Sequence, residues 1–187
     1  MASPVRFRLA DLEWMPDDGK RYEIIGGELH VSRPPHWLHQ ACCFRIAVAL
    51  DRWCREAGAG QAVMAPGLVL GDEDDVVPDV VWVSTARLKE SLDEAGHLRA
   101  APDLAVEVLS PGSANERRDR TLKLDLYSRR GVQEYWIVDW RLRQVEVYRR
   151  REMALEQVGT LREQDTLETP LLPGFRCPVA EQFDSLP

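Results

Sequence analysis

The pattern of apolar and polar residues predicts two long helices. In residues 38–57 apolar side chains recur every three or four positions, and Gly58 follows as a helix terminator. The second segment, residues 113–130, opens with the spacing of a capping box and meets Gly131.

Short apolar runs bounded by turn residues predict the strands. A hairpin is expected over residues 21–32, where Gly26 and Gly27 supply the positive φ angles of a tight turn. A short helix at 9–15 and a loop with a short closing element at 171–183 complete the pattern. Five further strands are expected at 61–70, 76–83, 104–109, 134–140 and 144–150.

Strands and helices follow one another in mixed order, which predicts an α/β (α+β) fold with a mixed β-sheet flanked by helices. The chain has 187 residues, of which 44% are apolar and 29% charged. This length and composition suit one core and a charged surface, so we expect a single domain over residues 1–187.

Composition also indicates the compartment. No apolar run approaches the roughly 20 residues that span a bilayer, and the N-terminus lacks the apolar stretch of a secretory signal. The four cysteines include no CxxC pair, which favours buried, reduced thiols over a zinc site. We therefore expect a cytoplasmic protein with no membrane partner.

Charge is distributed unevenly along the chain. The net charge is −7, which argues mildly against nucleic-acid binding. Residues 115–151, however, hold eleven Lys and Arg against six Asp and Glu, while the remainder is strongly acidic. This basic segment either faces a polyanion or is a solvated helix followed by an arginine-rich edge strand, and the sequence favours neither.

Two acids interrupt predicted strands that are otherwise apolar. Asp79 lies within residues 76–83, and Glu107 lies within residues 104–109. A buried carboxylate costs several kcal/mol unless it is paired or holds a metal. Either acid alone could reach solvent at a strand end or belong to a buried ion pair. If the two strands are neighbours, two close carboxylates require a cation or a proton.

A lysine follows in the second helix. Asp119, Lys123 and Tyr127 are spaced by four and fall on one helical stripe, from which Lys123 could project over the strand that carries Glu107. The simpler alternative is a surface pair between Asp119 and Lys123, worth a few tenths of a kcal/mol.

Two further residues are weaker candidates. Glu28 follows the predicted hairpin turn and could point to the same end of the sheet, or it is an exposed acid. His39 lies in the first turn of the first helix, where a side chain can reach a site, cap the helix or be partly buried.

Taken in order, six motifs resemble the Uma-two family, a group of bacterial restriction-endonuclease-like proteins in the PD-(D/E)XK nuclease superfamily. The resemblance covers about residues 9–178. Its motifs are Arg21-Tyr-Glu-Ile-Ile-Gly-Gly-Glu-Leu29, His39, Val77-Pro-Asp-Val80, Ala101-Pro-Asp-Leu-Ala-Val-Glu-Val-Leu-Ser-Pro111, Asp119-x3-Lys123-x3-Tyr127 and Gly131-Val-Gln-Glu-Tyr-Trp-Ile-Val-Asp139.

The resemblance implies a restriction-endonuclease-like core and a specific site. Asp79 takes the place of the superfamily's Asp, and Glu107 takes the place of its second acid. The usual lysine two residues after that acid is absent, and Lys123 on the following helix fits its role. The backbone carbonyl of Val108 is a further expected metal ligand. Glu28 and His39 match two further positions that recur in the family, and the resemblance implies no chemical role for either.

The implied activity is metal-dependent endonucleolytic hydrolysis of nucleic acid, with DNA favoured. Mg²⁺ or Mn²⁺ would be held by Asp79 and Glu107, because both ions prefer oxygen ligands. Lys123 would orient water or offset phosphate charge. Contacts to the nucleic-acid backbone are expected from Arg117, Arg118 and Arg120.

Other interpretations remain at this stage. A binding or regulatory module could keep the fold without turnover, which the acidic net charge favours. A two-carboxylate glycosidase leaves Lys123 without a role. A homodimer is suggested by an expected exposed strand edge at 144–148.

Overall fold

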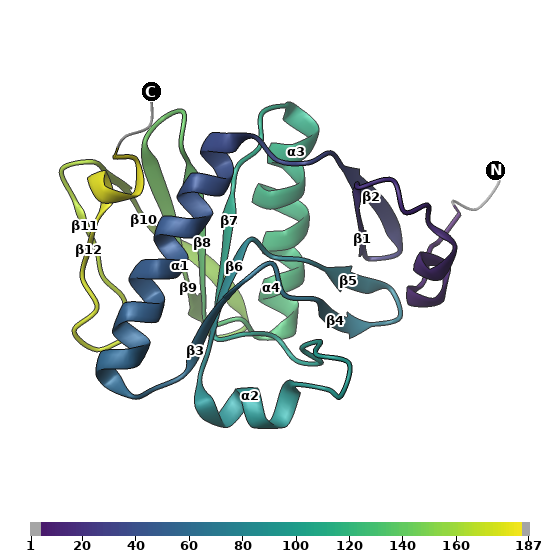
Figure 1. Cartoon of the computed structure of the whole chain (residues 1–187), viewed down its shortest axis with the longest axis horizontal. Coiled ribbons are helices and arrows are strands. Elements are labelled where there is room, and N and C mark those ends of the chain that lie inside the picture. Colours follow the sequence, from purple (N-terminus) through teal and green to yellow (C-terminus); the bar gives the residue numbers. More distant parts are fainter. Residues whose placement is uncertain (1–4, 185–187) are drawn as a thin grey trace.

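A six-stranded sheet forms the centre of the computed structural model, which describes residues 5–184 (Figure 1). Strands β7 and β8 run parallel and every other neighbouring pair is antiparallel, so the predicted mixed sheet is confirmed. In order across the sheet the strands are β10 (Ala154–Arg162), β9 (Gln144–Arg151), β8 (Glu134–Asp139), β7 (Leu104–Val108), β6 (Val80–Val83) and β3 (Gln61–Met64).

Helices cover both faces of this sheet (Figure 1). Helix α1 (Trp37–Ala57) packs on one face, in a core that includes Val106 and Trp136. Helix α4 (Leu124–Arg130) packs on the other, in a core that includes Ala105 and Tyr135. Because neighbouring residues of a strand point to opposite faces, both faces of β7 are buried, which explains its unbroken apolar run.

A second, four-stranded sheet lies beside the first (Figure 1). The predicted hairpin forms two of its strands, and Gly26 and Gly27 in the turn have φ angles of 57° and 77°. The order across this sheet is β2 (Glu28–Ser32), β1 (Arg21–Ile25), β5 (Asp74–Val76) and β4 (Leu68–Gly71).

Two predicted strands are each divided between the two sheets. The run 61–70 forms β3 and β4, because the chain turns at Ala65, which has a φ of 49°. The run 76–83 forms β5 and β6, with residues 77–79 between them. Pro78 lacks the N–H needed to continue a ladder, which is consistent with the break. Asp79 therefore lies in a connection between the sheets, and the prediction that it lies within a strand was wrong.

The predicted helix over 113–130 is interrupted. It consists of α3 (Ser113–Arg117), a π-helical turn η2 (Arg118–Lys123) and α4. The wider turn changes which side chains face the sheet, and π-helical segments often occur at functional sites.

The sequence pattern missed β10, whose side chains are mostly exposed and show no apolar alternation. Because β10 pairs along the whole of β9, the expected free edge at 144–148 was wrong, and the argument for a homodimer that rested on it is lost. The remaining elements are η1 (Leu9–Trp14), where a short helix was expected, α2 (Thr85–Ser91), β11 (Thr166–Leu167), β12 (Cys177–Pro178) and η3 (Val179–Gln182).

The four cysteines are buried and free, as predicted. Within residues 5–184, no helix combines the length and apolarity that a membrane crossing requires. The single domain expected over 1–187 extends beyond the described residues at both ends.

Trp136 is a sensitive probe of the central sheet. Its side chain is fully buried and stacks on the ring of Phe175. Its Nε1 donates a hydrogen bond to Glu134 Oε1 at 2.7 Å. Trp136→Ala should lower the free energy of unfolding by about 3–5 kcal/mol, because it leaves a cavity and removes the donor that Glu134 Oε1 accepts from. Urea denaturation measures this loss.

Trp14→Ala is the matched control, because this side chain is 85% exposed. It should change stability by no more than about 0.5 kcal/mol. Equal losses from the two variants would contradict the position of Trp136 in the core.

Candidate active site

Asp79 lies where the two sheets meet. The backbone N–H of Val108 donates to its Oδ2 at 2.9 Å, and His39 Nε2 lies 3.2 Å from the same oxygen. Arg21 reaches the other oxygen, Oδ1, at 3.4 Å. Burial alone raises the pKa of Asp79, but His39 and Lys123 outweigh it and the result is a pKa of about 2. This carboxylate is therefore ionised at neutral pH.

Glu107 points to the opposite face of β7 from Val106 and Val108, toward the helix that carries Lys123. Lys123 Nζ donates to its Oε1 at 2.9 Å, and the Tyr127 hydroxyl donates to the same oxygen at 2.8 Å. Burial raises the pKa of Glu107 to about 8 although Lys123 opposes the shift, and the nearby charge of Asp79 adds to it.

Glu23 is the site residue that the sequence analysis missed. It lies in β1 and is fully buried. Its Oε1 accepts from the Val77 N–H at 2.9 Å and forms an ion pair with Lys123 Nζ, 2.9 Å away. Its Oε2 is buried without a hydrogen-bond partner in residues 5–184, and the Arg118 guanidinium lies 3.8 Å away. The sequence signal was present, since Glu23 precedes the apolar pair Ile24-Ile25 in a predicted strand.

Lys123 is held by the π-helical turn. Its ammonium is fully buried, and Glu107 and Glu23 raise its pKa against the opposing effect of burial. Asp119 on the same turn is buried as well, but it pairs with Arg118, whose Nε donates to it at 2.9 Å. The alternative of a surface Asp119–Lys123 pair is therefore wrong.

The cluster holds more acids than bases. Burying a charge is costly unless an opposite charge offsets it, so one uncompensated negative charge favours a bound cation or a proton. The four carboxylates of Glu23, Asp79, Glu107 and Asp119 face the three cationic side chains of Arg21, Arg118 and Lys123.

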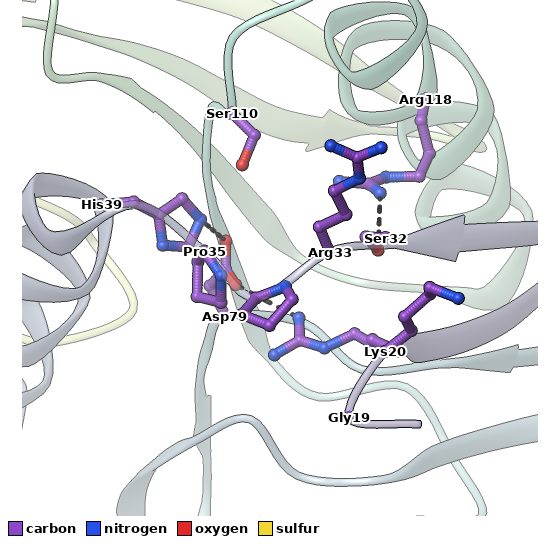
Figure 2. Close-up of a pocket in the computed structure, with 11 residues that line it drawn as sticks. Gly19, Lys20, Ser32, Arg33, Pro35, His39, Asp79, Ser110 and Arg118 are labelled. Atoms are coloured by element: carbon purple, nitrogen blue, oxygen red, sulfur yellow. Dashed lines mark hydrogen bonds and ion pairs between the residues drawn. The ribbon is translucent and has the colours of Figure 1, made fainter. Parts of the chain in front are cut away.

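A cavity of about 220 Å³ opens onto Asp79 (Figure 2). His39, Ser32 and Ser110 also line it, but Glu107 and Lys123 are buried and do not. An anion in this cavity would meet several positive charges close to one carboxylate. The cationic side chains around the cavity are Lys20, Arg21, Arg33 and Arg118.

A second hollow continues from the first, sharing the segment 32–35 and Ser110 with it. It extends to His36, whose ring stacks on Trp140 with the centroids 5.2 Å apart. The His36–Trp140 pair therefore lies beside the second hollow.

The other predicted residues lie elsewhere. Glu28 is exposed at the turn of the hairpin, the opposite end from Arg21, so it does not join the cluster. Arg117 is exposed and does not line the cavity. Arg120 pairs with Glu146 at 2.6 Å and with Glu116 at 2.9 Å, which offsets its charge.

Much of the basic segment 115–151 is similarly engaged in ion pairs. These pairs favour the simpler interpretation of the charge distribution, and the cations that face the cavity come mainly from the N-terminal hairpin region instead. The paired arginines include Arg120, Arg130, Arg141 and Arg149.

The fold is shared with a solved structure. A crystal structure described as "a putative nuclease belonging to DUF820", from Anabaena variabilis ATCC 29413, superposes with a TM-score of 0.77. The two chains are 19% identical, and the match covers 96% of this chain and 98% of the other.

The chain belongs to the Uma2 family, described as "Putative restriction endonuclease", whose model matches residues 9–180. This is the family that the ordered motifs indicated. No curated protein matches the chain.

Lys123 should be essential to the stability of the cluster. Lys123→Met leaves Glu23 and Glu107 buried without their common cation, so unfolding free energy should fall by about 3–5 kcal/mol. Adding Glu23→Gln removes the buried charge of Glu23 and should restore part of the loss. Urea denaturation in the presence of EDTA measures both effects.

Lys89→Met serves as the control because Lys89 is exposed on α2. It should leave stability within about 0.5 kcal/mol of wild type. A Lys123→Met protein as stable as this control would show that the buried cation does not hold the cluster together.

Proposed function

We propose that the protein is a metal-dependent endonuclease that hydrolyses phosphodiester bonds in nucleic acid, DNA above all. The observation that carries this proposal is the position of Asp79. It is an ionised, buried carboxylate, tied to the strand that carries Glu107, at the base of a cavity lined by four cationic side chains. Metal-dependent hydrolysis of a phosphodiester needs positive groups that bind the phosphate oxygens, and it needs acidic groups that bind the metal.

The donor set suits Mg²⁺ or Mn²⁺. Asp79 and Glu107 offer carboxylate oxygens, the Val108 carbonyl directly follows Glu107 in β7, and both ions favour oxygen ligands. Both hydrogen bonds that Glu107 accepts reach Oε1, so Oε2 is the oxygen available to a ligand. When bound, such an ion lowers the pKa of a coordinated water and stabilises charge on phosphate oxygens.

The chain's own residues have separate roles in this proposal. Lys123 holds Glu107 and offsets its charge, and because the ammonium is buried we assign it no contact with the substrate. Arg33 and Arg118 line the cavity and would bind phosphate oxygens. His39 orients Asp79 through its contact with Oδ2.

A nuclease-fold binding module without turnover is the second candidate. It is favoured by the engagement of Glu107 with Lys123 and Tyr127, which together occupy one of its two oxygens. Cleavage and binding measurements on the same variants separate the two functions.

Asp79→Asn should abolish metal-dependent cleavage while keeping the shape of the side chain. Nicking of supercoiled plasmid and of single-stranded DNA, each with Mg²⁺ or Mn²⁺, is the measurement. We expect a fall of at least about a hundredfold, the scale on which loss of one group that stabilises the transition state acts. Asp72→Asn, at an exposed position, is the control and should leave cleavage unchanged.

Undiminished cleavage by Asp79→Asn would remove Asp79 from the active site. Metal-independent DNA binding by a wild-type protein that never cleaves would instead support the silent module.

Arg33→Ala should weaken DNA binding without regard to sequence. Arg33 is exposed and lines the cavity, so its loss removes one phosphate contact. In an Asp79→Asn background, the slope of log K against log salt should become shallower by about 0.7 for single strands or about 0.9 for duplex. Fluorescence anisotropy over a salt series measures this slope.

Arg55→Ala, on the exposed side of α1, is the matched control. Its slope should equal that of the background protein. If Arg33→Ala leaves the slope unchanged as well, the cavity does not hold the phosphate backbone.

A further inference from the structure

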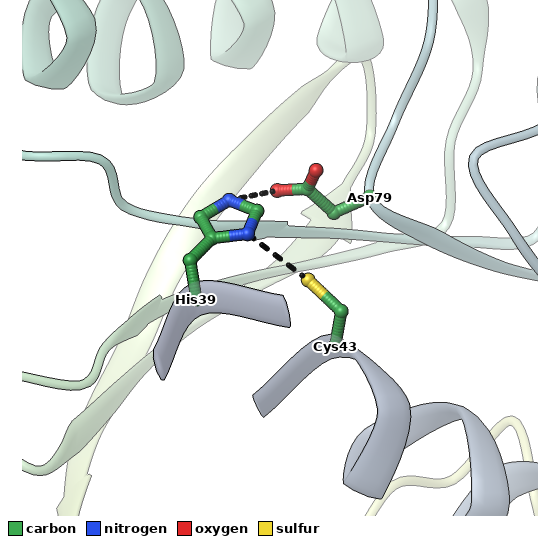
Figure 3. Close-up of side chains that lie close together, drawn as sticks. All are labelled: His39, Cys43 and Asp79. Carbon is green, nitrogen blue, oxygen red and sulfur yellow. Dashed lines mark hydrogen bonds and ion pairs between the residues drawn. The ribbon is translucent and has the colours of Figure 1, made fainter. Parts of the chain in front are cut away.

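His39 and Cys43 converge on Asp79 from one face of α1 (Figure 3). They are four residues apart, so both side chains lie on the same side of the helix. His39 Nδ1 lies 3.5 Å from Cys43 Sγ, and Nε2 of the same ring lies 3.2 Å from Asp79 Oδ2. One potential ligand atom from each of the three residues lies within 4.8 Å of the others.

The chemistry of this trio differs from that of the proposed nuclease metal. Imidazole nitrogen, thiolate sulfur and carboxylate oxygen are the ligands of Zn²⁺, whereas Mg²⁺ avoids sulfur. Two ligands of a tetrahedral zinc ion lie about 3.2–3.8 Å apart, as metal–ligand distances of about 2.0–2.3 Å require. The two separations at His39 involve different ring nitrogens, so only one of them can be a ligand–ligand spacing at a single ion. The third ligand would reach that ion by side-chain rotation, from a starting separation of no more than 4.8 Å.

The three residues are also placed for entry of an ion. His39 and Asp79 line the 220 Å³ cavity, while Cys43 lies behind them and is fully buried. An ion held here would therefore take two ligands from the cavity wall and one from behind it. The cavity side leaves room for a water molecule as the fourth ligand, as in open zinc sites.

We propose that His39, Cys43 and Asp79 form a binding site for a thiophilic divalent cation of the Zn²⁺ type. The Cys43 thiol releases its proton to water as the ion binds. The sequence has no CxxC pair and so gives no sign of a zinc site, because this site takes its ligands from a helix and from the connection that precedes β6.

The site also has a consequence that rests on the proposed nuclease function. Asp79 belongs to both sites, so a thiophilic ion that takes Asp79 withdraws it from the Mg²⁺ or Mn²⁺ site. Zn²⁺ should therefore inhibit metal-dependent cleavage, and Cys43→Ser should relieve that inhibition.

Binding of Co²⁺, a spectroscopic substitute for Zn²⁺, tests the site without any assay of activity. Wild-type protein titrated with Co²⁺ should develop a thiolate-to-cobalt charge-transfer band with one equivalent of metal, and added Zn²⁺ should abolish it. Cys43→Ser should lose the band.

Cys42→Ser is the matched control, since Cys42 is the adjacent cysteine, is equally buried, and contacts the Gln182 carbonyl instead of His39. It should keep the band. Circular dichroism establishes that both variants are folded, and Cys43→Ala replaces Cys43→Ser if the serine variant is not. No band in the wild type, or a band that survives in a folded Cys43 variant, would overturn the proposal. Because the titration does not depend on cleavage, failure of this site and failure of the nuclease proposal are distinguishable.

Discussion

The site depends on one buried ammonium group. Lys123 donates to Glu107 in the central sheet and contacts Glu23 in the second sheet, while its own backbone belongs to the π-helical turn. Strands β1 and β7 and the π-helical turn, which are remote from one another in sequence, are thus joined by the ammonium group of Lys123. Each carboxylate would be costly to bury alone, so the arrangement is stable only when all three members are present. This mutual requirement fixes the hairpin sheet against the central sheet.

The position of Asp79 follows from that junction. The chain leaves β5 of the second sheet and enters β6 of the central sheet, and Asp79 lies in the short connection, bonded to the N–H of Val108. The hairpin that supplies Glu23 also supplies Arg21, which contacts Asp79 from the cavity side. The same contact between sheets therefore places a buried acidic cluster next to a cation-lined cavity, the combination on which the proposed phosphodiester chemistry rests.

Much of this arrangement was predictable from the sequence. The apolar periodicity predicted α1, and the Gly26-Gly27 pair predicted the hairpin. Asp79 and Glu107 were singled out as acids within apolar runs, and Lys123 as a lysine on the helix that follows. Propensity could not show that the run containing Asp79 divides between two sheets, because both halves are apolar and the division depends on tertiary pairing.

Two other features of the site were not predicted. Glu23 showed the same anomaly as Glu107 but lay in a short hairpin strand, where one face is ordinarily solvated. Arg117, Arg118 and Arg120 of the second predicted helix were expected to bind nucleic acid. Of these, only Arg118 lines the cavity, and ion pairs such as Arg120–Glu146 appear only in three dimensions.

The proposed chemistry requires Asp79 and Glu107 to hold one catalytic divalent cation, with Lys123 beside Glu107. A crystal structure of the protein with Mn²⁺, located by its anomalous scattering, measures this directly. One Mn²⁺ should be bound by carboxylate oxygens of both Asp79 and Glu107, with the Lys123 ammonium still on Glu107. Crystals saturated with Mn²⁺ that show no ion between these two carboxylates would contradict it.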